Sequence, residues 1–273
     1  MRTIHEDAAV GEAEDFPTSA YDSAAPTFAR DRALPDDAVE LVRTVVLAAV
    51  ALPSPRLLDL GAGSGRIGWP FVRAGDDYVG IDLSLGMLRA FCACERAARL
   101  VRADGESLPF RDGTFDAVML IQVFGGARRW RPLLDEARRV LRASGALIVG
   151  RTVAPEDGLD ARMKERLATV LDGMGVKPYQ TRARADAQSW LEANGRGTRA
   201  VAARWTASRT PRGFIERHRT GARFARLADE IKDEAMQKLG AWAAQEFGSL
   251  DAPWREPHEF ELQVFRFEQE AGR

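Results

Sequence analysis

Residues 56–65 read Arg-Leu-Leu-Asp-Leu-Gly-Ala-Gly-Ser-Gly, an apolar run that ends in a carboxylate and three alternating glycines. The run predicts a buried strand, and the glycines predict a tight turn into a helix. Glycines lack the β-carbons that hold a ligand away from the backbone, and the start of a helix presents unpaired N–H groups. The stretch therefore predicts an α/β fold with a nucleotide-like ligand at this turn.

The turn by itself is compatible with more than one ligand. Gly63-Ser-Gly65-Arg-Ile-Gly68 also matches the G-x-G-x-x-G pattern of dinucleotide sites. Asp59 would repel the two phosphates of a dinucleotide, whereas it suits the ammonium and sulfonium groups of S-adenosylmethionine. The charge favours S-adenosylmethionine. A plain glycine turn with a solvated Asp59 is the alternative without a ligand.

Two further apolar runs also end in an acid. Residues 78–82 end in Asp82 and are followed by Ser84, which is suited to cap a helix. Residues 100–104 end in Asp104 and are followed by Gly105. Asp82 could accept hydrogen bonds from ribose hydroxyls, and Asp104 with the Gly105 N–H could bind an adenine. Carboxyl ends of parallel strands share one edge of the sheet, where such sheets bind ligands.

Four motifs occur in order between residues 56 and 150. They are Leu-Leu-Asp-Leu-Gly-Ala-Gly-Ser-Gly-Arg (57–66), Val-Gly-Ile-Asp-Leu-Ser (79–84), Asp-Gly-Glu-Ser-Leu-Pro-Phe (104–110) with Asp-Gly-Thr-Phe-Asp-Ala-Val (112–118), and Arg-Val-Leu-Arg-Ala-Ser-Gly (139–145). The chain resembles the class I S-adenosylmethionine-dependent methyltransferases, in particular their type 11 small-molecule subgroup. Residues 21–28 are similar to the Tyr-Asp segment that often leads into this domain.

The resemblance implies a cofactor site and a reaction. The expected cofactor residues are Asp59, Gly61, Ala62, Gly63, Gly65, Asp82, Leu83, Met87, Asp104, Gly105 and Gln122. Arg30 or Arg66 could pair with the methionine carboxylate. The expected activity is transfer of the sulfonium methyl to a small-molecule acceptor by in-line displacement. No catalytic residue is identified, because Gln122-Val-Phe124 stands where many relatives have a histidine.

Periodicity extends the expected fold beyond these motifs. Apolar runs at 115–121 and 145–150 add a fourth and a fifth strand, and helical stripes follow at 133–141 and 159–174. We predict a doubly wound, mostly parallel seven-stranded sheet with an antiparallel last strand. That last strand, at 259–264, alternates apolar and polar residues, so we expect it to be half-exposed and to pair with 201–205.

We expect three parts in the chain. Residues 1–35 form a lead and possible cap, residues 36–207 with 258–268 form the methyltransferase core, and residues 208–257 form a helical insertion. A helix should begin after Asp36, as its cap, and end near residue 51. The insertion either stabilises the sheet edge or roofs the acceptor pocket.

The acceptor side is less defined. Tyr21, Phe124, Arg151 and His218 are the expected pocket residues. His218, His258 and His5 are interpreted as surface or packing residues rather than as general bases. Residues 181–226 hold eleven arginines against three acids. We interpret them as solvated helix faces, with recognition of an anionic acceptor or of RNA phosphates as the alternative.

Composition is consistent with a small-molecule enzyme. The chain has 273 residues and a net charge of −1, which gives no overall attraction to nucleic acid or anionic lipid. Cys92 and Cys94 point to different faces of a helix, so no metal site is expected. No secretion signal or membrane span is found, so we expect a cytoplasmic protein.

Two other functions remain open. One is an S-adenosylmethionine-binding protein of the same fold that transfers no methyl group, such as a ring-forming enzyme or a regulatory module. The other is an NAD-dependent oxidoreductase, which would bind the dinucleotide more tightly than S-adenosylmethionine.

Overall fold

The computed structural model describes residues 19, 21–22, 25, 28, 32–125, 129–176, 182–219, 221, 224 and 227–268. The chain divides into two compact units. The sheet unit comprises Met1–Thr152, Thr181–Ala203 and Phe260–Arg273, and the helical unit comprises Val153–Gln180 and Arg204–Glu259. Each unit is described by itself.

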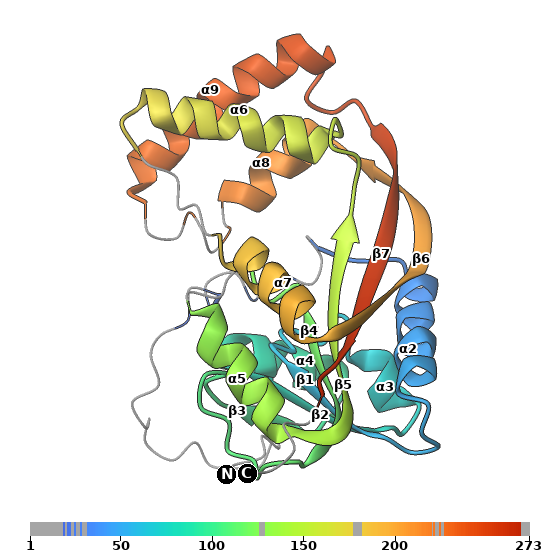
Figure 1. The fold of residues 1–273 in the computed structure, drawn as a ribbon. Coiled ribbons are helices and arrows are strands. Elements are labelled where there is room, and N and C mark those ends of the chain that lie inside the picture. The colour runs from blue at the N-terminus through green and yellow to red at the C-terminus, as the bar shows by residue number, and fades with distance from the viewer. Residues whose placement is uncertain are drawn as a thin grey trace. The chain divides into compact units, whose positions relative to one another are not determined.

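A seven-stranded sheet has the order β3-β2-β1-β4-β5-β7-β6 (Figure 1). The strands are β1 (Arg56–Leu60), β2 (Asp77–Asp82), β3 (Leu100–Arg102), β4 (Phe115–Ile121), β5 (Leu141–Val153), β6 (Arg196–Arg209) and β7 (Trp254–Arg266). Strands β1 to β5 pair in parallel, and β7 is antiparallel. The predicted doubly wound sheet with an antiparallel last strand is confirmed.

Helices of the sheet unit cover both faces of its strands. They are α2 (Asp36–Val50), α3 (Trp69–Arg73), α4 (Leu85–Cys94), α5 (Trp130–Val140) and α7 (Ala183–Asn194). On one face, Tyr78 of β2 packs against Phe71 of α3 and Phe91 of α4. On the other face, α5 and α7 share a core cluster with the strands. Apolar residues on both sides of β1, β2 and β4 are therefore buried, as their continuous runs predicted.

Two local predictions were wrong. Asp36 is the first residue of α2 rather than its cap, because Pro35 occupies the cap position. Strand β7 is not half-exposed: Glu261 and Gln263 are only 8% and 7% exposed. The reason is the position of β7 between β5 and β6, on a face where α7 packs near Phe265. The alternating polar residues Glu261 and Gln263 of β7 are therefore buried rather than exposed to solvent.

The helical unit has its own apolar core. Its helices are α6 (Leu159–Gly173), α8 (Pro211–Arg219) and α9 (Asp229–Phe247). Met163, Phe214 and Leu239 are fully buried in one cluster between them. Helices α8 and α9 lie between β6 and β7 in the chain, whereas α6 follows β5. The cluster shows that the segment after β5 packs together with the segment between β6 and β7.

Within the part of the chain that the structure describes, no helix is long and apolar enough to cross a membrane.

Candidate cofactor site

The glycine turn after β1 is left-handed at three positions. Gly61, Gly63 and Gly65 have φ values of 84°, 57° and 81°. A β-carbon on Gly61 would lie 2.8 Å from Val123, and one on Gly65 would lie 2.1 Å from the Phe91 ring. A β-carbon on Gly63 would meet only the Gly61 carbonyl, at 4.0 Å. Gly61 and Gly65 are thus required by packing, whereas Gly63 faces space that the described residues leave open.

Hydrogen bonds hold the turn against the end of β2. The N–H groups of Gly61 and Ala62 donate to the Ile81 carbonyl at 2.9 and 2.8 Å. The Gly63 N–H donates to Asp82 Oδ2 at 2.9 Å. Ser64 is 7% exposed, and its Oγ is buried without a partner among the described residues. The backbone of the turn is therefore fixed before any ligand binds.

Asp82 ends β2 and lies directly beside this turn. Its Oδ1 accepts from the Ser84 N–H at 2.8 Å. Burial raises the pKa of Asp82, while its bonds to the Ser84 and Gly63 N–H groups lower it. Ser84 caps α4 by accepting from the Met87 N–H at 3.2 Å, as predicted. Asp82 thus joins the first and second strand ends into one polar edge.

Asp59 does not face open space. It is 2% exposed, and its Oδ2 accepts from the Tyr78 hydroxyl at 2.7 Å. Burial raises the pKa of Asp59 to about 6, and the Tyr78 hydrogen bond acts against that rise. The same surroundings raise the pKa of Tyr78. The carboxyl group expected to attract a ligand cation therefore lies in the packed layer between β1, β2 and α3.

Asp22, a residue to which the sequence assigned no role, binds the start of α4. Its Oδ1 accepts from Ser84 Oγ at 2.5 Å and from the Gly86 N–H at 3.2 Å. Its negative charge contributes to the raised pKa of Asp82. Asp22 belongs to the Tyr-Asp segment at 21–28, so the resemblance of that segment could have indicated a role for this residue.

The expected adenine residues lie around β3. The Glu106 N–H donates to Asp104 Oδ1 at 2.9 Å, which shapes the turn after that strand. A β-carbon on Gly105 would lie 2.5 Å from Leu133, so packing alone requires this glycine. Leu83 is half-buried and its carbonyl accepts from Arg102, whereas Met87 is only 2% exposed.

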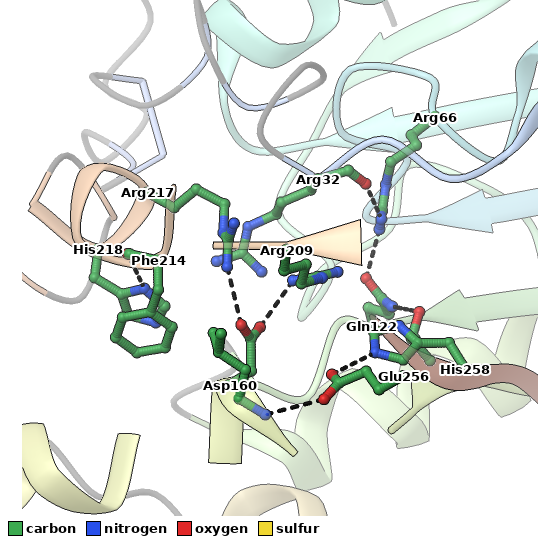
Figure 2. A network of polar contacts seen from close by, with 12 residues as sticks. Arg32, Arg66, Gln122, Asp160, Arg209, Phe214, Arg217, His218, Glu256 and His258 are labelled. Carbon is green, nitrogen blue, oxygen red and sulfur yellow. Dashed lines mark hydrogen bonds and ion pairs between the residues drawn. The ribbon is translucent and has the colours of Figure 1, made fainter. Parts of the chain in front are cut away.

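Gln122 lies at the end of β4 in a strained conformation. Its φ is 58°, which is uncommon for a residue with a β-carbon. Its Oε1 accepts from Arg66 at 2.5 Å, and its Nε2 donates to Thr152 at 2.9 Å. Arg66 also donates to the Arg32 carbonyl at 2.7 Å (Figure 2). Gln122 thus connects the ends of β4 and β5 to Arg66, which directly follows the glycine turn.

The expected acceptor residues occupy different settings. The Tyr21 ring packs edge-on against Phe28 at 6.0 Å. Phe124 is 5% exposed and belongs to the core cluster of the sheet unit. Arg151, at the end of β5, forms an ion pair with Glu261 at 3.2 Å. Arg30 lies outside the described residues.

His218 belongs to the helical unit, where it is half-buried beside the core residue Phe214. Its ring stacks on Phe214 at 3.7 Å, and its Nδ1 contacts the Phe214 carbonyl at 2.8 Å. Burial lowers the pKa of His218 to about 4. Nearby, the Asp160 carboxylate pairs with Arg209 and Arg217 at 2.8 and 3.0 Å (Figure 2). The His218 ring is therefore neutral near pH 7, as part of a packed aromatic stack.

A second histidine of the helical unit forms a buried pair. His258 is 3% exposed, and its Nε2 contacts Glu256 Oε1 at 2.9 Å (Figure 2). Glu256 Oε2 accepts from the Leu159 N–H at 2.9 Å, which satisfies the first N–H of α6. Glu256 therefore caps a helix while it holds His258, a role that the sequence did not reveal.

Most of the arginines between 181 and 226 have acidic partners. The pairs are Arg196 with Glu268, Arg199 with Glu261, Arg204 with Glu259, Arg209 with Asp160, Arg212 with Asp251, Arg217 with Asp160 and Arg219 with Asp233. These ion pairs leave fewer unmatched positive charges than the sequence suggests.

The edge of the sheet combines a glycine turn with acidic side chains, a combination suited to binding a cofactor. Three successive strands, β1, β2 and β3, bring the glycine turn, Asp82 and Asp104 to the same edge. Within the described part of the chain, Gly63 leaves room beside a fixed backbone, and the Ser64 hydroxyl has no hydrogen-bond partner. The residues present therefore fit a ligand that has an adenosine and a charged, amino-acid-like end.

Residues 58–149, which contain this entire edge, match the family described as a methyltransferase domain. These residues are a methyltransferase domain. The domain is of the S-adenosylmethionine-dependent kind, in agreement with the cofactor expected from the sequence.

Curated relatives resemble part of the chain. A demethylmenaquinone methyltransferase from Renibacterium salmoninarum is 35% identical over 116 residues, which are 42% of this chain and 49% of the relative. One from Streptomyces avermitilis is 36% identical over 107 residues, which are 39% of this chain and 46% of the relative. The matched region spans about half the length of these relatives.

Solved structures share the fold over more of the chain. The YcgJ protein from Bacillus subtilis has a TM-score of 0.53 at 19% identity, over 84% of this chain and all of that one. The [4+2]-cyclase SpnF has a TM-score of 0.52 at 19% identity, over 93% of this chain and 97% of that one. At this identity the likeness establishes the fold alone.

Proposed function

We propose that the whole protein transfers a methyl group from S-adenosylmethionine to a small-molecule acceptor by in-line displacement. The observation that carries this proposal is the edge of the methyltransferase domain, where Gly63 opens onto space beside Asp82. The demethylmenaquinone methyltransferases it resembles take a small molecule as acceptor, which supports an acceptor of that class.

The sheet order supports a proposed direction for the cofactor. Asp104 follows β3, Asp82 ends β2 and Gly63 follows β1, and these three strands are neighbours. We propose that Asp104 and Gly105 hold the adenine, Asp82 the ribose and the glycine turn the methionine portion. The reactive end then points toward β4 and β5, the next strands in the sheet. When bound, S-adenosylmethionine supplies a methyl group on an already activated sulfonium leaving group.

The protein's own task is then mainly alignment. Hydrogen bonds to Arg66 and Thr152 fix the side chain of Gln122 at the end of β4. We propose that Gln122 forms one rigid side of the acceptor pocket. A rigid wall restricts the acceptor to poses in line with the transferred group, which is a large source of rate enhancement. A general base is needed only if the acceptor must lose a proton during attack.

The test uses cofactor carrying a labelled methyl group and a small-molecule extract. We expect label to appear in a low-molecular-weight product when wild-type protein is present, and not with Gly63→Val protein. Tight cofactor binding without any labelled product would instead favour a binding protein or ring-forming enzyme of the same fold. Label in protein or RNA fractions alone would contradict a small-molecule acceptor.

A further inference from the structure

A cluster of charged side chains lies where β5, β6 and β7 of the sheet unit meet. Its centre is the buried carboxylate of Glu261 on β7. Arg151 of β5 contacts Glu261 Oε1 at 3.2 Å, and Arg199 of β6 contacts Oε2 at 3.4 Å. The arginine side chains are 40% and 59% exposed, so the cluster is open to solvent on their side.

A third guanidinium makes the cluster strongly cationic. Arg184, in the first turn of α7, is exposed and interacts with both Arg151 and Glu261. Partial burial, and then the positive charge of Arg151, lower the pKa of Arg184. Three arginines against one glutamate give a net charge of +2 for these four residues. Among the described residues, no acid forms an ion pair with Arg184.

A buried amide next to the carboxylate also lacks a partner. Gln263 is 7% exposed, and its Nε2 donates to Glu261 Oε1 at 3.4 Å. Gln263 Oε1 is buried without a hydrogen bond within the described part of the chain. A buried polar atom is normally satisfied, so this acceptor calls for a hydrogen-bond donor, while the excess positive charge of the arginines calls for an anionic group.

The cluster is at the edge of the sheet that binds ligands. Arg151 directly follows Gly150, whose carbonyl accepts from the Gln122 N–H at 2.9 Å. Strand β5 is separated from β1 by β4 alone, so its end lies roughly 10 Å from the glycine turn. Asp82 and Asp104 lie on the opposite side of β1. The positive cluster is therefore on the side of the proposed cofactor site toward which the proposed reactive end points.

We propose that Arg151, Arg184 and Arg199 bind an anionic group, a carboxylate or a phosphate, of the methyl acceptor. The inference rests on the proposed function, because it assigns this site to the acceptor. Guanidinium groups match the planar geometry of carboxylates and the oxygens of phosphates. Glu261 contacts two of the arginines and leaves the net charge of the four residues positive.

The experiment measures binding of simple probes to the full-length protein by calorimetry, at one ionic strength set with sodium chloride. The probes are benzoate, phenyl phosphate and the neutral benzamide. We expect one or both anions to bind wild-type protein at least about tenfold more tightly than benzamide. The preferred anion distinguishes a carboxylate site from a phosphate site. Equal affinity for all three probes would overturn the proposal.

Three variants locate the binding. Arg184→Gln should weaken anion binding by about tenfold, since it removes the arginine of the cluster that forms no ion pair with an acid among the described residues. Glu261→Gln should strengthen it several-fold, because the net positive charge rises. Arg204→Gln is the matched control: Arg204 is also an exposed arginine of β6 and pairs with Glu259 at 2.7 Å. Its anion affinity should equal that of wild type.

Cofactor titrations separate the two proposals. All three variants should bind S-adenosylmethionine like wild type. Loss of anion binding with Glu261→Gln, or unchanged binding with Arg184→Gln, would overturn the anion site while the cofactor site stands. A wild-type protein that does not bind S-adenosylmethionine would instead contradict the proposed function.

Discussion

Individual residues at the turn after β1 have two kinds of role that look the same in the sequence. Gly61 and Gly65 exist because Val123 and Phe91 occupy the space a β-carbon would need. Gly63 has the same left-handed backbone, but among the described residues the nearest atom to that space is the Gly61 carbonyl oxygen, at 4.0 Å. Only Gly63 is therefore expected to matter through a ligand as well as through backbone strain.

Gly63→Val should abolish binding of S-adenosylmethionine. The matched control is Gly113→Val, since Gly113 has a φ of 61° and a β-carbon at that position would have no atom within 4 Å. Both variants carry the same backbone strain, so each should lose about 1–3 kcal/mol of stability. Calorimetry should show cofactor binding to the Gly113 variant alone. If the Gly63 variant also bound normally, the turn would not be the ligand site.

Asp59 gives a prediction about pH. Burial raises the pKa of Asp59 from 3.8 to about 6 in the folded protein, so ionisation costs more there than in the unfolded chain. The stability that the protein gains from keeping this carboxyl neutral is complete below about pH 4. It is lost as the pH rises through about 6. Asp59→Asn keeps an acceptor for the Tyr78 hydroxyl but cannot ionise.

Urea unfolding at several pH values tests this directly. The gain in unfolding free energy from Asp59→Asn should grow between pH 4 and pH 7, by on the order of 1–3 kcal/mol, and then level off. A variant whose stability relative to wild type did not change with pH would show that Asp59 is not the buried acid proposed.

At the scale of elements, α4 is tied to a segment far away in the sequence. Ser84 caps the helix through the Met87 N–H and also donates to Asp22, which in turn accepts from the Gly86 N–H. The start of α4 is thus shared between its own cap and the segment that precedes α2. Because Asp82 binds the Ser84 N–H, the same contacts support the proposed ribose site.

A double-mutant cycle measures this connection. Ser84→Ala should destabilise the protein by about 1 kcal/mol through loss of the cap. Asp22→Ala should cost less in a protein that already carries Ser84→Ala, with a coupling on the order of 1 kcal/mol. Strictly additive changes in chemical denaturation would mean that Asp22 and Ser84 do not interact in solution.

The elements also show what the sequence can and cannot predict. Continuous apolar runs identified the buried parallel strands, and the Ser84 cap followed from its position after β2. The burial of Glu261 was missed, since alternation reports which face a residue takes and not whether α7 covers that face. Asp59 illustrates the same limit: its pairing with Tyr78 depends on two strands being neighbours.

At the scale of the whole molecule, the proposed cofactor site is better defined than the proposed acceptor site. The proposed cofactor edge is built from motifs close in sequence, so local patterns were enough to predict it. The proposed anion site draws Arg151, Arg184, Arg199 and Glu261 from four separate elements, and only the fold brings them together. The acceptor site therefore has to be inferred from the structure, because sequence motifs do not indicate it.

The most direct test of the cofactor assignment is a calorimetric titration of the wild-type protein with S-adenosylmethionine and, separately, with NAD. We predict saturable binding of S-adenosylmethionine and much weaker binding of NAD, because Asp82 and the buried Asp59 disfavour a pyrophosphate at the glycine turn. Tighter binding of NAD, or no binding of S-adenosylmethionine, would contradict the assignment.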